Sequence, residues 1–101
     1  MQDLLITGGM VVDPANGVHR GADITIDKGR VLAVGDGMYR GSARQVVEVA
    51  GQWVLPGLVD SHVHVSSNPE GYRMMARAGV TCALDMAGQP GEIIQGLQRA
   101  G

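Results

Sequence analysis

Residues 56–65 read Pro-Gly-Leu-Val-Asp-Ser-His-Val-His-Val, and this stretch decides how the rest of the sequence is interpreted. Its apolar residues predict a strand from Leu58 to Val65. Side chains two residues apart on a strand point the same way, so we expect Asp60, His62 and His64 on one face. Imidazoles placed in this way can bind one divalent metal, and a neighbouring carboxylate can orient them.

The residues that follow predict a helix, a second strand and a second helix. Asn68 is a suitable N-cap, Pro69 suits the first helical position, and Gly79 can end the helix. A second apolar strand is expected over residues 80–85, and Pro90 opens the second helix. This order is typical of a parallel sheet with helical crossovers, in which active sites lie at the C-terminal ends of the strands.

The residues before this stretch predict short strands separated by turns. Ala22, Ile24 and Ile26 alternate with polar residues, which is the pattern of a half-buried strand. The turn at residues 27–29 then predicts a hairpin. We therefore expect a small antiparallel sheet, or part of a β-sandwich, over residues 1–55 and the start of a β/α barrel over residues 56–101.

Composition limits the classes of protein and partner. The chain has 101 residues, 45% of them hydrophobic and 18% charged, which fits a soluble globular domain and excludes a complete eight-fold barrel of about 250 residues. The net charge of −2 gives no electrostatic case for binding nucleic acid or an anionic membrane. The N-terminus lacks the pattern of an export signal, and no apolar run is long enough to span a membrane. A cytoplasmic location is expected.

Several other residues could carry chemistry, but a structural role is the stronger prediction for each. Cys82 is the only cysteine, which excludes an internal disulfide and fits a reducing compartment, and we expect it to be buried. Asp85 ends the second strand and is expected to cap the loop that follows. His19 is expected to be a solvated loop residue. Core filling is expected of three methionines and of the apolar stripe of the second helix, namely Met74, Met75, Met86, Ile93, Ile94, Leu97 and Ala100.

A series of short segments resembles the N-terminal region of the metal-dependent amidohydrolase superfamily, which includes dihydroorotase, hydantoinase and several deacetylases and deaminases. The segments occur in the family's order and end in the stretch quoted above. Residues 78–85 also resemble the family's second barrel strand, with Cys82 in place of a second threonine. The other matching segments are residues 3–9, 12–14, 22–24 and 28–31.

The resemblance implies roles for three residues. His62 and His64 match the pair that ends the first barrel strand and binds the metal, which is Zn²⁺ in many members, as one or two ions. Asp60 matches the acidic residue before that pair and is expected to support the ligands. The general-base Asp and the remaining ligands are expected beyond Gly101, so no catalytic residue is assigned within this chain.

The implied activity is hydrolysis of an amide or cyclic amide C–N bond in a small molecule by metal-activated water. The 101 residues alone are expected to be inactive, as the N-terminal portion of such an enzyme. Two alternatives stay open: a deaminase of the same superfamily with one metal, and a non-catalytic structural module. Uncovered apolar faces predict that the chain self-associates or forms a homo-oligomer.

Overall fold

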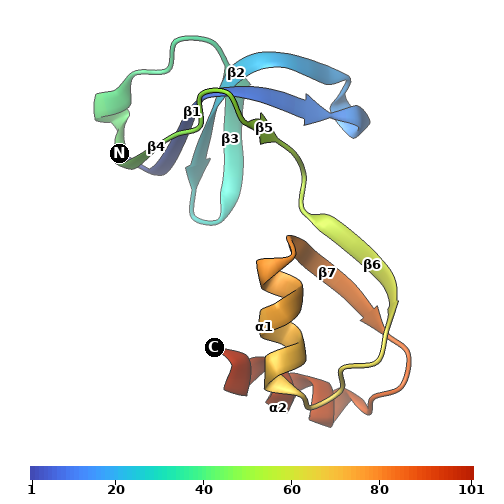
Figure 1. Cartoon of the computed structure of the whole chain (residues 1–101). Coiled ribbons are helices and arrows are strands. Elements are labelled where there is room, and N and C mark those ends of the chain that lie inside the picture. The colour runs from blue at the N-terminus through green and yellow to red at the C-terminus, as the bar shows by residue number, and fades with distance from the viewer. The chain divides into compact units, whose positions relative to one another are not determined.

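The computed structural model describes residues 1–101 and contains two compact units, Met1–Pro56 and Gly57–Gly101 (Figure 1). The first unit consists of strands with two short 3-10 turns. The second unit contains two strands and two helices. The protein is therefore a mixed α/β chain with a strand-rich N-terminal part, as the sequence predicts. None of its helices is long and apolar enough to cross a membrane.

The first unit is one mixed sheet in the order β3-β2-β1-β4, and β5 also pairs with β1. β1 is antiparallel to β2 but parallel to β4 and β5, so the first of the two expected alternatives, a small antiparallel sheet, is wrong, and the sheet is mixed. Residues 36–42 connect β3 to β4, which lies on the side of β1 away from β2 and β3. β4 runs parallel to β1. The elements are β1 (Gln2–Asp13), η1 (Pro14–Asn16), β2 (Val18–Asp27), β3 (Arg30–Gly35), η2 (Arg40–Ser42), β4 (Ala43–Glu48) and β5 (Trp53–Val54).

Two adjacent glycines interrupt the ladder between β1 and β2. The register shifts between Ile6 and Gly9, and Gly8 adopts a φ of +84°, a conformation that side chains disfavour. A Cβ atom at Gly9 would lie 2.8 Å from methyl groups of Val49 and Val54. Thr7 and Gly8 together oppose Asp23 and form a β-bulge inside one continuous strand, while Gly9, which pairs with Ala22, brings the backbone of β1 close to its neighbours.

The predicted hairpin between β2 and β3 is confirmed. Lys28 and Gly29 form its two-residue loop, with φ values of 50° and 73°, which are those of a type I′ turn. The core cluster of the unit consists of Val11, Ala22 and Ile24. Leu5, Gly9 and Thr25 are buried as well.

Asp23 ties β2 to the bulge and to the segment before β4. Its carboxylate accepts hydrogen bonds from the Thr7 hydroxyl at 2.7 Å, from the Gly8 N–H at 3.1 Å and from the Met38 N–H at 3.0 Å. These donors, the Thr7 hydroxyl foremost, hold the pKa of Asp23 below its ordinary value. The charged carboxylate is therefore the form that the fold stabilises.

Asp23→Asn is expected to lower the free energy of unfolding by about 1–2 kcal/mol near neutral pH, because a charged acceptor of three hydrogen bonds is lost. A carboxyl with a lowered pKa in the folded state stabilises fully above its unfolded pKa of about 3.9 and loses this contribution as the pH falls through the folded pKa. Urea unfolding at several pH values should show the difference from the wild type shrinking below about pH 3.9. Asp36→Asn, which changes an exposed carboxylate, is the control, and an equal Asp23→Asn deficit at pH 3 and pH 7 would contradict this account.

The second unit has the predicted order of strand, helix, strand and helix. Its elements are β6 (Leu58–Val63), α1 (Pro69–Arg77), β7 (Val80–Asp85) and α2 (Pro90–Ala100). β6 and β7 pair in parallel, as expected. A cavity of ≈ 420 Å³ lies between the sheet and the helices, and its walls include Val63, Val65, Tyr72, Met75 and Ile93.

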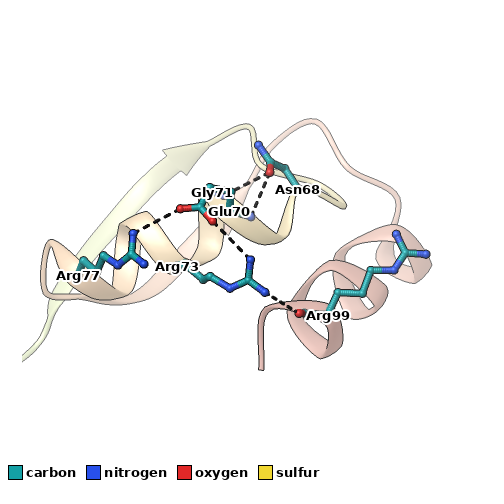
Figure 2. A network of polar contacts seen from close by, with 6 residues as sticks. All are labelled: Asn68, Glu70, Gly71, Arg73, Arg77 and Arg99. Carbon is teal, nitrogen blue, oxygen red and sulfur yellow. Dashed lines mark hydrogen bonds and ion pairs between the residues drawn. The ribbon is translucent and has the colours of Figure 1, made fainter.

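The helix α1 begins and ends as its sequence predicts. The Asn68 side chain accepts hydrogen bonds from the N–H groups of Glu70 and Gly71 at 3.2 and 3.3 Å (Figure 2). At the other end, Gly79 has a φ of +82°. Figure 2 also shows Arg73 donating both to the Glu70 carboxylate and, at 3.0 Å, to the carbonyl oxygen of Arg99. This guanidinium joins α1 to the last turn of α2.

Several predicted core residues of the second unit are exposed. Met74, Met86, Ile94 and Leu97 are each more than half exposed, and Cys82 is exposed as well. The reason is that each helix or strand of this unit has few neighbours, and β7 pairs only with β6. Gly96 is the one buried residue of α2. In the first unit, His19 is exposed as expected but lies within β2 rather than in a loop.

Candidate metal site

The structure brings His62 and His64 together at the C-terminal end of β6. Their Nε2 atoms are 3.0 Å apart, and the two rings stack with centroids 5.0 Å apart and planes at 27°. Both side chains are exposed. Val63 and Val65 line the cavity under the helices, so the alternation along the chain directs the two imidazoles to the other face of the sheet.

The ladder ends before the second histidine. β6 stops at Val63, two residues earlier than predicted, because the chain turns sharply soon afterwards. Ser66 adopts a φ of +43°, which is uncommon for a residue with a side chain. His62 therefore lies within β6, at a register shift between Asp60 and Val63, whereas His64 lies in the segment that leads into the turn.

Asp60 lies two residues before His62 on β6, where a register shift begins. Its Oδ1 atom accepts a hydrogen bond from the main-chain N–H of His62 at 3.1 Å. The carboxylate thus contacts the backbone that carries the first histidine. Its expected support of the ligands stays a prediction.

Asp85 caps the loops at this end of the sheet, as the sequence predicts. Its Oδ2 atom accepts from the Ser66 N–H at 2.6 Å, and its Oδ1 atom accepts from Ala87 and Gly88 at 3.0 and 3.1 Å. The Ala87 N–H is the main cause that lowers the pKa of Asp85, and the Ser66 and Gly88 N–H groups add to it. Burial, together with the charge of Asp85, raises the pKa of Tyr72, whose hydroxyl donates to the Ser66 carbonyl oxygen.

The histidine pair fits part of a metal site. Zn–N bonds are about 2.0–2.1 Å long, so two Nε2 atoms 3.0 Å apart can reach one ion with little movement. Zinc sites normally take three or more protein ligands. No group of three or more His, Cys, Asp or Glu side chains that could hold a metal occurs in the chain. Within these 101 residues, the pair alone does not complete such a site.

Several solved amidohydrolase structures are similar to this chain over part of their length. In solved structures, D-aminoacylase, studied for its binuclear metal centre, matches with a TM-score of 0.70 and 36% identity over 82% of this chain and 18% of its own. The N-acyl-D-glutamate deacylase of Bordetella bronchiseptica, solved with zinc, matches with a TM-score of 0.67 and 30% identity over 81% of this chain and 18% of its own.

Curated relatives agree with the structural neighbours. The dihydroorotase of Trichlorobacter lovleyi is 32% identical over 81% of this chain and 19% of its own length. Adenine deaminase 2 of Agrobacterium fabrum is 39% identical over 82% of this chain and 15% of its own length. No family model matches the chain. The chain is similar to the N-terminal region of amidohydrolase superfamily members, and it spans less than a fifth of the length of these two relatives.

Sequence reasoning missed three residues that shape this end of the sheet. Ser66 lies in the turn after the histidines with a positive φ. The Tyr72 hydroxyl donates to the Ser66 carbonyl oxygen, and Gly96 packs against the same oxygen. Only Gly96 had a local signal, since a glycine inside a helix disfavours that helix and often marks a close contact.

Proposed function

We propose that this chain is the N-terminal portion of a metal-dependent hydrolase that cleaves amide or cyclic amide C–N bonds in small molecules. The observation that carries the proposal is the 3.0 Å separation of the His62 and His64 Nε2 atoms at the end of β6. The names of the relatives, dihydroorotase and D-aminoacylase, support this substrate class.

In this proposal His62 and His64 bind a divalent metal, with Zn²⁺ as the first candidate and one or two ions in the whole site. A divalent metal held by these residues would supply Lewis-acid polarisation of the substrate carbonyl and activation of water near neutral pH. Asp60 holds the backbone at His62, and the turn at Ser66 holds the backbone after His64. The general base and the other ligands come from residues outside these 101, so the isolated chain has no turnover.

Zinc titration of the 101-residue chain, followed by NMR of the histidine ring signals, tests the pair as ligands. The signals of His62 and His64 should shift together over the same range of zinc concentration. His19 is an internal control, because it is also exposed but lies beside Trp53 in the first unit. His64→Ala should remove the response of His62 as well.

Two outcomes would contradict the proposal. One is an equal response of all three histidines, which would indicate nonspecific binding to exposed imidazoles. The other is an unchanged His62 response in His64→Ala, because a shared ion requires both nitrogens.

A deaminase is the second candidate, and the identity of 39% with adenine deaminase 2 favours it. The two functions differ in the product that a protein carrying these residues and a complete barrel would release. Ammonia release from an aminopurine would support the deaminase. Ring opening of a cyclic amide or deacylation would support the first proposal.

We also propose that the isolated chain self-associates. Leu58, Val59 and Leu84 on the two parallel strands are each more than half exposed. Burying apolar surface of this kind is worth about 25 cal/mol per Å², which favours association. Sedimentation velocity over a range of concentrations should show oligomers, and a monomer throughout that range would refute this proposal.

A further inference from the structure

Three elements of the second unit meet at the turn that follows the histidine pair. Asp85, at the end of β7, accepts the Ser66 N–H at 2.6 Å. Tyr72 of α1 donates to the Ser66 carbonyl oxygen. Gly96 of α2 lies so close that a Cβ atom there would be 2.7 Å from the same oxygen. Both polar groups of the Ser66 peptide backbone are therefore held by side chains.

The two histidines are held by different means. His62 lies within β6, at a register shift between the Asp60–Ala83 and Val63–Asp85 pairs, so paired residues of β6 flank it on both sides. His64 lies beyond the last strand residue, so its position depends on where the chain goes next. After the histidine pair, the Ser66 N–H is the first main-chain donor that bonds to an acidic side chain. The acceptor is the carboxylate of Asp85.

Asp85 links the end of β7 to this turn. The main-chain N–H of Met86 donates to the carbonyl oxygen of Val63 at 3.0 Å, so the ends of the two strands are aligned. The other carboxylate oxygen of Asp85 is fixed by the N–H groups of Ala87 and Gly88. A side chain anchored on one oxygen in this way presents the other oxygen at a defined place.

We propose that Asp85 is a positioning residue for the metal site. By holding the Ser66 N–H, it fixes the path of the chain after β6 and keeps the His64 imidazole beside the His62 imidazole. This inference rests on the proposed function of the pair as metal ligands. Asp85 does not touch the metal in this arrangement. It acts through the backbone of residues 65 and 66.

The test compares Asp85→Asn with the wild-type 101-residue chain by NMR, first without metal. In the variant the Ser66 amide is expected to exchange about tenfold faster or more, since its acceptor is weakened. The nuclear Overhauser effect between the His62 and His64 rings should become weaker in the same variant. Asp13→Asn is the matched control, because Asp13 also accepts a hydrogen bond in an exposed turn, from the Asn16 side chain at 2.6 Å.

A second variant keeps the proposal testable if Asp85→Asn fails to fold. Tyr72→Phe removes the hydrogen bond to the Ser66 carbonyl oxygen and leaves the carboxylate in place. The nuclear Overhauser effect between the His62 and His64 rings should become weaker in this variant as well. A wild-type ring contact in either folded variant would overturn the proposal.

Zinc titration of the same samples separates this inference from the proposed function. In Asp85→Asn the zinc affinity of the pair should fall about tenfold, the size typical for losing a group that orients a ligand. If the wild-type pair binds no zinc while Asp85→Asn still separates the rings, the proposed function fails and the positioning role stands. If the wild type binds zinc while the variant keeps both ring contact and affinity, the positioning role fails alone.

Discussion

Replacing His62 by alanine, in a protein that joins these residues to a complete barrel, is expected to lower amide hydrolysis at least about 1,000-fold, or about 4 kcal/mol of transition-state stabilisation. The reason is that the metal would lose one of two imidazoles whose Nε2 atoms are 3.0 Å apart. His64→Ala should have an effect of the same size. Because both residues would serve one ion, the double variant should be little worse than either single variant.

The measurement is kcat/KM on a cyclic amide and on an N-acyl amino acid, together with the metal content of each purified variant. His19→Ala is the control, since it removes an exposed histidine from the first unit. Chelation should abolish the wild-type activity and added Zn²⁺ should restore it. Full activity in His62→Ala with a wild-type metal content would exclude the pair from the site.

Gly96→Ala is expected to lower the free energy of unfolding of the second unit by about 3 kcal/mol, the upper part of the usual range for overpacking. A Cβ atom at this position would lie 2.7 Å from the Ser66 carbonyl oxygen and 2.9 Å from the Ser67 Cα atom. Both are backbone atoms of a turn that Asp85 and Tyr72 already hold. The turn cannot move away without breaking those hydrogen bonds.

Gly91→Ala in the same helix is the matched control. Nothing lies within 4 Å of a Cβ atom at Gly91, and alanine favours a helix by about 0.5–1 kcal/mol over glycine. Urea unfolding should therefore show the two substitutions acting in opposite directions. A Gly96→Ala chain that is as stable as the wild type would mean that α2 does not pack on the turn in this way.

Features that depend on neighbouring residues in the sequence were predictable. Asn68 and Pro69 define the start of α1 because an N-cap needs only the next N–H groups. The Lys28-Gly29 turn defines the hairpin because its two positive φ values are local properties. The histidine pair was predictable for the same reason, since period-two alternation requires no distant partner.

Features that depend on distant residues were not predictable. The parallel pairing of β1 with β4 and β5 depends on the path of residues 36–42, for which the sequence carries no periodic signal. The exposure of Ile94 and Leu97 depends on how many elements surround α2. The turn at Ser66 depends on a carboxylate 19 residues away.

The bulge at Thr7 and Gly8 determines which side chains of β1 share a face before and after it. Ile6 and Val11 are an odd number of residues apart, so an uninterrupted strand would place them on opposite faces. The extra residue of the bulge puts both against Ala22 and Ile24 in one core. Deleting Gly8 would therefore transfer every later side chain of β1 to the other face of the sheet, so that one residue without a side chain determines which surface of the sheet becomes the interior.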